Sequence, residues 1–237
     1  MITIGNFFFK YRNFLFIFLY LALFIPSAPL FKEAQFGPNY PLFIGLFITI
    51  FGQLIRGVTI ALAYIIRGGK NKKVHADDLV TEGIFKHCRN PLYVGNILML
   101  VGVGILINSL LFTTLFIPLF LFIYQAIVLA EENFLRNKFG EQFDAYCKKV
   151  SRWFINFNGM FTTIGSMKFN GKRWLTKEYN TQTVWMLGIV FILLFYYPQL
   201  TQNDTALRNL LFGIACVLLA IYYLSIRYLK KSGKWVS

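Results

Sequence analysis

Two short polar motifs interrupt an otherwise apolar chain, and their residue types could bind a charged small molecule. The first is Arg89-Asn90-Pro91, which begins an apolar run. Proline is favoured in the first turn of a helix, so Arg89 and Asn90 are expected at a helix N-terminus. Free N–H groups and the positive dipole end there favour an anion. A routine helix start, with an interfacial arginine and Tyr93, is the alternative interpretation.

The second motif is a pair of adjacent carboxylates, Glu131-Glu132, directly after another apolar run. Apolar residues then recur at three- and four-residue steps, which predicts one face of an amphipathic helix. They are Leu135, Phe139, Phe143, Tyr146 and Val150. Gly140 is expected to interrupt or bend this helix. The helix could lie on the bilayer surface, or it could close as a lid over the membrane-embedded bundle.

A third candidate site lies inside an apolar run. Gln53 and Arg56 are three residues apart and therefore share one face of a helix. Arg56 lies ten residues before Ile66, where the run ends, which is a depth of roughly 15 Å in a helix. An intramembrane charge indicates a functional site or a structural ion pair. Glu131 and Glu132 are the candidate partners for such a pair.

The composition indicates that lipid surrounds most of the 237-residue chain. Hydrophobic residues make up 57% and charged residues only 14%, whereas about a quarter of a soluble domain is charged. Six apolar runs approach the roughly 20 residues that a spanning helix needs. They are Phe14–Phe31, Leu42–Ile66, Leu92–Ile107, Leu110–Ala130, Val184–Leu200 and Ala206–Tyr228. The sequence therefore predicts an all-α, polytopic integral membrane protein of about six spans, with one domain over residues 1–237.

Smaller features predict how the third and fourth runs connect and pack. Asn108-Ser109 separates them and predicts a tight helical hairpin. Gly102 and Gly104 lie in the third run, where small residues let helices approach closely.

The distribution of positive charge predicts the orientation. With a cytoplasmic N-terminus, six spans place 21 of the 24 Lys and Arg residues on the same side, counting Arg227 at the end of the last run. Positive loops remain in the cytoplasm, so both termini are expected there. The net charge of +14 then reflects topology and attraction to anionic membrane lipids. No nucleic-acid partner is expected, because the basic residues flank the spans.

Cysteine and histidine predict neither a disulfide framework nor a metal site. Cys88 and Cys147 fall on the predicted cytoplasmic side and Cys216 in a span, where disulfides are not expected. His75, His87 and Cys88 lack a familiar metal-ligand spacing.

The two polar motifs together resemble the isoprenylcysteine carboxyl methyltransferase family and the related phospholipid methyltransferases, in a bacterial form. The first family motif stands here as LVTEGIF and RNPLYVG, within Leu79–Gly95. The second stands as EENFL, FG, Phe143, Tyr146 and VSR, ending at Arg152. Their order and the hairpin between them match over residues 79–152, the motif core. The first and last apolar runs carry no diagnostic residues, and residues 184–228 are expected to form a C-terminal helical pair.

Four positions depart from the family pattern. Asn90 replaces the usual histidine, and Phe85 and Phe143 replace usual tyrosines. Ile127 stands where eukaryotic members have an arginine on the substrate side.

The resemblance implies S-adenosylmethionine as cofactor, bound in a cytosolic region that the two motifs form. Leu79, Val80 and Phe85 would pack against the adenosine. Arg89, Asn90, Pro91 and Tyr93 would hold the methionine part. The implied cofactor-binding set is Leu79, Val80, Phe85, Arg89, Asn90, Pro91, Tyr93, Glu131 and Glu132. Glu131 would also lie where cofactor and substrate meet, and Arg152 or Arg56 could orient a substrate carboxylate. These three are the candidate catalytic residues.

The leading expected reaction is O-methylation of a carboxylate on a lipidic substrate that enters from the bilayer. N-methylation of a lipid amine is the alternative, and it requires a base such as Glu131 or Glu132. An NADPH-dependent membrane reductase and a non-enzymatic carrier are the candidates from other classes. The resemblance to bacterial members implies an inner-membrane location.

Overall fold

The computed structural model describes residues 1–32, 37, 39–63 and 74–235, and these form two compact units. Unit 1 is Met1–Lys168 and unit 2 is Phe169–Ser237. Helices make up the regular structure of the described residues, apart from one isolated bridge between Pro29 and Ser109. The predicted all-α class is therefore confirmed, whereas the single domain stays a prediction.

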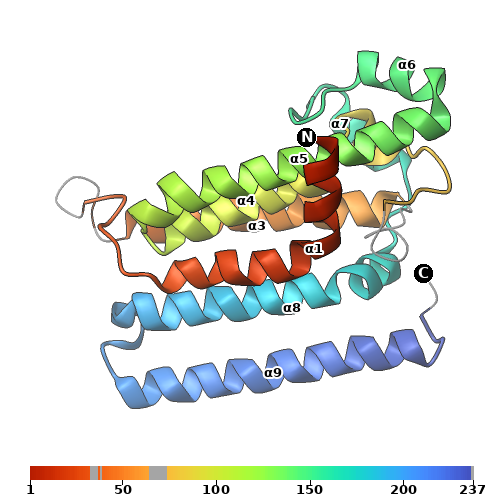
Figure 1. Ribbon diagram of the computed structural model, residues 1–237. Coiled ribbons are helices and arrows are strands. Elements are labelled where there is room, and N and C mark those ends of the chain that lie inside the picture. The colour runs from red at the N-terminus through yellow and green to blue at the C-terminus, as the bar shows by residue number, and fades with distance from the viewer. Residues whose placement is uncertain (33–36, 38, 64–73, 236–237) are drawn as a thin grey trace. The chain divides into compact units, whose positions relative to one another are not determined.

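Unit 1 contains the two predicted motifs (Figure 1). Its described elements are α1 (Ile2–Leu21), η1 (Ala22–Phe24), α3 (Tyr40–Leu62), η2 (Gly83–Lys86), α4 (Pro91–Leu106), η3 (Phe112–Phe116), α5 (Ile117–Phe139), α6 (Glu141–Lys149) and α7 (Met160–Ser166). Helix α4 packs along α3 and also contacts α5, while α1 packs along α5.

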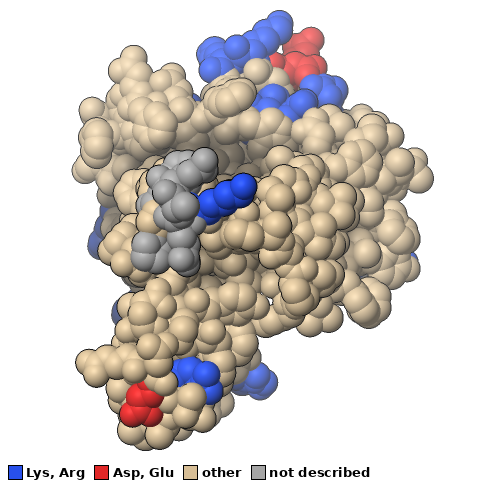
Figure 2. Space-filling view, turned by 90° about the vertical axis from the view of Figure 1, so that its left-hand side faces the viewer, with Lys and Arg blue, Asp and Glu red and all other residues tan. Residues whose placement is uncertain are grey.

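Five described helices are long and apolar enough to cross a membrane. They are Ile2–Phe24, Tyr40–Leu62, Phe112–Phe139, Gly171–Tyr196 and Thr205–Lys231. Helix α4 is a shorter apolar helix, as its short run predicted. On the face in Figure 2, residues other than Lys, Arg, Asp and Glu cover most of the surface. These features confirm the predicted polytopic membrane fold.

The predicted bounds of the first span were wrong. The sequence placed it at Phe14–Phe31, but the helix begins at Ile2 and η1 ends at Phe24. Lys10 and Arg12 were taken as residues outside the span, whereas both lie within α1. Long basic side chains can follow a helix surface and reach a polar partner, so they do not mark the end of a helix.

Glycine allows α3 and α4 to approach very closely. A Cβ on Gly102 would lie 2.4 Å from the backbone N of Thr49, and one on Gly52 would lie 2.6 Å from the carbonyl O of Gly95. A Cβ on Gly104 would meet the Phe112 ring at 3.0 Å. The predicted role of Gly102 and Gly104 in packing is therefore confirmed.

The predicted hairpin after α4 is also confirmed. Asn108 adopts a positive φ of 54°, which ends α4 and turns the chain toward η3, a single π-helical turn. Its side chain then fixes the chain that follows η1. Asn108 Oδ1 accepts from the Phe31 N–H at 2.8 Å, and Nδ2 donates to the Phe31 carbonyl at 3.1 Å.

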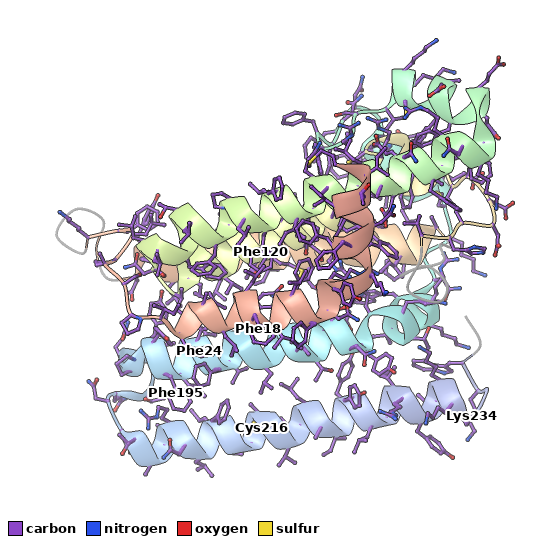
Figure 3. The ribbon with its side chains drawn as sticks, viewed as in Figure 1. Phe18, Phe24, Phe120, Phe195, Cys216 and Lys234 are labelled. Carbon is purple, nitrogen blue, oxygen red and sulfur yellow. The ribbon has the colours of Figure 1, made fainter. Side chains whose placement is uncertain are left out.

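An aromatic core joins α1 to α5. Phe120 is fully buried and points from α5 toward α1 in Figure 3. Its ring lies 5.3 Å from that of Phe16 and 5.5 Å from that of Tyr20, centroid to centroid. This core holds the C-terminal half of α1 against the first turns of α5.

Unit 2 is a pair of helices, α8 (Gly171–Tyr196) and α9 (Thr205–Lys231), joined through η4 (Pro198–Thr201). Asp204 caps α9 by accepting from the N–H groups of Ala206 and Leu207. Phe195, labelled in Figure 3, packs edge-on against Phe212 with ring centroids 5.4 Å apart. Aromatic side chains, more than close backbones, form this contact.

Candidate functional site

The first motif forms the start of α4, as its sequence predicted. Pro91 is the first helical residue and Asn90 is the N-cap. The Asn90 side chain does not cap the helix, because its Nδ2 donates to the carbonyl of Arg152 at 3.2 Å. The Arg89 N–H donates to the Ser151 carbonyl at 2.9 Å. The end of the second motif therefore runs directly beside the first.

Glu132 joins the two motifs through a buried ionic cluster. Its carboxylate accepts from Nε and Nη2 of Arg152, at 3.0 and 2.7 Å, in a bidentate pair. Arg89 Nη1 lies 3.5 Å from the same carboxylate, which is 4% exposed. The hydrogen bonds from Arg152 to Glu132 raise the pKa of Arg152. Two guanidinium groups thus compensate the burial of one carboxylate.

Glu131 has a different partner from its neighbour. Its Oε1 accepts from the Tyr93 hydroxyl at 2.8 Å. The same hydroxyl accepts from Arg12 Nη1 at 3.5 Å. Arg12 comes from α1 and its guanidinium stacks 4.3 Å from the Phe9 ring centroid. Tyr93 therefore connects a carboxylate of α5 with a cation that sequence reasoning had placed outside the spans.

Helix α6 covers the beginning of the first motif. The helix is interrupted at Gly140, which has a positive φ of 51° and separates α5 from α6. This confirms the predicted interruption. The Tyr146 hydroxyl donates to the Phe85 carbonyl at 2.7 Å, and Arg89 donates to Cys147 Sγ. Burial raises the pKa of Tyr146, so its hydroxyl keeps the proton that it donates. This packing supports both the lid and the surface-helix interpretations, which stay predictions.

Two buried residues before Arg89 anchor the segment that follows α6. His87 contacts the Asn156 carbonyl through Nδ1 at 2.8 Å and the Thr163 hydroxyl through Nε2 at 2.9 Å. The Cys88 thiol donates to the Arg152 carbonyl at 3.5 Å, and burial raises its pKa. Sequence reasoning considered His87 as a metal ligand and Cys88 as a metal ligand or disulfide cysteine, and it missed this role.

The loop before η2 is tied to the end of α5. Lys138 Nζ donates to the carbonyls of Ala76 and Asp77, and His75 Nε2 lies 2.8 Å from an Asp77 carboxylate oxygen. The predicted adenosine-packing residues Leu79 and Val80 are half-buried and follow this loop. Phe85 lies in η2. A lysine near the end of a span is common, so no sequence signal marked Lys138.

Arg56 lies buried between α3 and α4 inside the helix bundle. It is 3% exposed and donates from α3 to Asn96 Oδ1 and, at 3.4 Å, to the Leu92 carbonyl of α4. Gln53, which lies on the same helix face, is 7% exposed. Its Nε2 and Oε1 atoms have no hydrogen bond within the described structure. The described contacts of Glu131 and Glu132 are to other residues, so the suggested ion pair with Arg56 is not among them.

The structure therefore brings six predicted residues into one cluster and places the others around it. The cluster consists of Arg89, Asn90, Tyr93, Glu131, Glu132 and Arg152. Pro91 begins the helix that carries Tyr93, and Arg56 contacts that helix at the Leu92 carbonyl and at Asn96. Guanidinium donors and carboxylate acceptors therefore lie close together at the start of α4.

Residues 42–142 match the family model of phospholipid methyltransferases. This match confirms the resemblance that the two motifs indicated. The matched range contains the predicted site residues with the exception of Arg152.

Curated relatives match over a similar share of the chain. The cobalt-zinc-cadmium resistance protein CzcN of Cupriavidus metallidurans is 36% identical to this protein. The aligned region covers 39% of this chain and 40% of CzcN. The protein-S-isoprenylcysteine O-methyltransferase of Schizosaccharomyces pombe is 34% identical, over 42% of this chain and 43% of its own length. A probable enzyme of the same name from Oryza sativa is 28% identical over 46% and 58%.

The chain spans about half the length of the curated relatives it matches. No solved structure matches this chain. The matches support a membrane methyltransferase, in agreement with the apolar helices.

The charged groups of the cluster fit the methionine part of S-adenosylmethionine. Arg89 Nε is buried and has no hydrogen-bond partner in the described structure, so a donor remains for a ligand carboxylate. Glu132 is occupied by two guanidinium groups, whereas the hydrogen bond described for Glu131 comes from the neutral Tyr93 hydroxyl. Glu131 is therefore the carboxylate better able to accept from a ligand ammonium.

The residues that the structure describes contain no group of three or more metal-ligating His, Cys, Asp or Glu side chains.

Proposed function

We propose that this protein is an S-adenosylmethionine-dependent methyltransferase that O-methylates a carboxylate on a lipidic substrate within the bilayer. The observation that carries the proposal is the cluster of Arg89, Tyr93, Glu131 and Glu132, which lies inside the matched family range. Relatives named protein-S-isoprenylcysteine O-methyltransferase support the choice of a carboxylate acceptor.

The cluster residues would bind the cofactor through opposite charges. S-adenosylmethionine would supply a methyl group that its sulfonium activates. Arg89 and the free N–H groups at the start of α4 would bind its carboxylate. Glu131, oriented by Tyr93, would bind its ammonium. Leu79, Val80 and Phe85 would pack against the adenosine.

Three further groups would act on the substrate and on water. Arg152 is about one-third exposed beside Glu132, so it could orient a substrate carboxylate at the surface of the cluster. Arg56 could do so from inside the bundle, near Leu92. Helix α6 would exclude water, because Tyr146 and Cys147 hold it against residues 85–89.

A carboxylate acceptor needs little catalytic assistance from these side chains. It is already an anionic nucleophile, so no general base is needed. Correct positioning can then supply about 7–11 kcal/mol of the barrier reduction. The contacts around Glu132 are suited to positioning, since Arg152 and Arg89 hold its carboxylate from two sides.

N-methylation of a lipid amine is the second candidate, and the phospholipid methyltransferase family match favours it. The amine must lose a proton before it attacks the methyl group. Glu131 would accept that proton, because Glu132 is bound by Arg152 and Arg89. Glu131 would therefore bind the cofactor ammonium in O-methylation and accept the proton of the amine in N-methylation.

The proposed topology places the cluster and both termini in the cytoplasm, at a bacterial inner membrane. The support is the excess of Lys and Arg in the segments on that side.

Methyl-label transfer from S-adenosylmethionine into a total membrane extract tests the proposal. Base-labile label in a lipid-soluble product is expected and indicates a methyl ester. Base-stable label would instead indicate a methylamine and select the second candidate. Titration of the purified protein with S-adenosylmethionine and with NADPH is the companion measurement. Binding of NADPH alone would indicate a reductase, and binding of neither would indicate a non-enzymatic carrier.

A further inference from the structure

The segment after α6 exposes large aromatic side chains although it lies beside the candidate site. Phe154 is 83% exposed and Phe161, in α7, is 89% exposed. Phe157 between them is 62% exposed. Single exposed apolar residues are ordinary, but three phenylalanines within eight residues form a surface that indicates a binding partner.

This surface lies where the apolar part of the bundle begins. The Arg89 N–H bonds the Ser151 carbonyl, and the Asn156 N–H bonds the His87 carbonyl at 3.0 Å. Both bonds hold the segment at the start of α4, whose sixteen residues are apolar almost throughout. Helix α7 packs on η2, immediately before that start. The exposed phenylalanines are therefore at the level where a spanning helix enters the hydrocarbon.

The segment after Asp144 carries charge of one sign. Residues 145–168 contain four basic residues and no Asp or Glu. Lys148, Lys149 and Lys168 are exposed, and Arg152 is partly exposed. Aromatic residues interleaved with lysine and arginine are typical of segments that bind the interface of an anionic bilayer.

We infer that residues 154–161 insert into the headgroup region of the surrounding bilayer, and that Lys148 and Lys149 bind anionic phospholipid headgroups beside them. The phenylalanine rings enter the boundary of the acyl chains, and the ammonium groups remain among the phosphates. The partner surface is the protein's own membrane, whose negative charge complements the acid-free segment.

The anchored segment also holds the candidate site in place. His87 is bonded to Asn156, between Phe154 and Phe157, and to Thr163, two residues after Phe161, and Arg89 follows His87 by two residues. Insertion of the segment thus restrains the residues that precede α4. This inference needs no cofactor or substrate, so its test is independent of methyl transfer.

The experiment measures the depth of a fluorescent label in nanodiscs. An environment-sensitive dye is attached to Phe161→Cys in a background of Cys147→Ser and Cys216→Ser. The control dye is attached to Glu141→Cys, an exposed position on α6. Nanodiscs of phosphatidylcholine, with and without phosphatidylglycerol, contain lipids that carry a quencher close to the headgroup.

The dye at position 161 is expected to be quenched, more strongly with phosphatidylglycerol, while the dye at position 141 is not. Lys148→Gln with Lys149→Gln should remove most of the dependence on lipid charge, since one cation near an anionic surface shifts such an equilibrium about fivefold. Lys10→Gln, an exposed lysine outside the segment, should preserve it.

Two results would overturn the inference. One is a dye at position 161 that lipid quenchers do not reach in either membrane. The other is shielding that appears only with two protein copies in one nanodisc, which would assign the surface to self-association.

Discussion

The α3–α4 pair of unit 1 and the α8–α9 pair of unit 2 are both apolar, but they pack by opposite means. A Cβ added to Gly45, Gly52 or Gly102 would collide with the backbone of the facing helix in unit 1. A Cβ added to Gly188 or Gly213 of unit 2 would meet nothing within 4 Å. There the contacts are side chains, such as Phe195 on Phe212 and Tyr222 on Gln182.

Close backbones allow polar contacts across the α3–α4 interface of unit 1. When α3 and α4 nearly touch, polar side chains of one helix reach carbonyls of the other, as Arg56 reaches Leu92 and the short Thr49 reaches Met99. Such contacts compensate buried polar groups and fix their geometry. The two pairs therefore differ in whether glycine is needed for their helices to approach.

The largest expected effect is a loss of stability in Glu132→Ala. The change leaves Arg152 and Arg89 without their shared carboxylate, and breaking a buried pair costs roughly 3–5 kcal/mol. Thermal unfolding in detergent measures it. Asp204→Ala, which removes the cap of α9, is the control from unit 2 and should cost about 1 kcal/mol. Equal losses in the two variants would contradict the difference between the units.

Glu131→Gln should separate chemistry from stability at the adjacent position. The amide keeps the size of the side chain and can still accept from Tyr93, so the melting temperature should not change. Methyl transfer should fall by about 100-fold or more, the scale of a positioned acid–base or charge contact. Full activity in this variant would remove Glu131 from the site and leave Glu132 as the candidate.

Arg89→Ala should weaken S-adenosylmethionine binding by about 1.5–3 kcal/mol, the scale of a charge-assisted hydrogen bond. The fold should persist, because Arg152 still binds Glu132. Calorimetry measures the affinity. Lys86→Ala removes an exposed cation three residues earlier and is the matched control. If both variants bind as the parent does, Arg89 is an interfacial anchor.

Gly102→Ala against Gly213→Ala compares the two helix pairs directly. The added methyl group collides with Thr49 in unit 1, and overpacking of this kind costs about 1–3 kcal/mol. In unit 2 the methyl group meets open space, and alanine favours a helix over glycine by about 0.5–1 kcal/mol. Thermal unfolding should therefore shift in opposite directions. Shifts of the same sign would show that the close approach does not limit stability.

The smallest expected effect is a difference in the rate of cysteine alkylation. A water-soluble, membrane-impermeant maleimide should modify the half-buried Cys147 before Cys88, because burial raises the pKa of Cys88 and keeps its thiol protonated. Cys216, labelled in Figure 3, lies in the apolar helix α9 and should react slowly in a membrane. Mass spectrometry after short exposure gives the order. In right-side-out vesicles, rapid modification of Cys147 would contradict its cytoplasmic placement.

The sequence by itself determined the features that depend on local or compositional rules. The apolar runs predicted an all-helical membrane fold because backbone polar groups must be paired within lipid. Pro91 marked the start of α4, and Gly140 marked a break, because each residue restricts or permits particular backbone angles. Asn108 marked the hairpin for a related reason, since it tolerates a positive φ.

Only the tertiary structure decided which polar groups meet. Arg12, Tyr93 and Glu131 come from three different helices, and no spacing in the sequence relates them. The same holds for the contact of Arg89 with Cys147. Glu131 and Glu132 are adjacent in the chain, yet consecutive side chains on a helix point about 100° apart. One therefore faces Tyr93 while the other faces two arginines, so two adjacent residues have different partners.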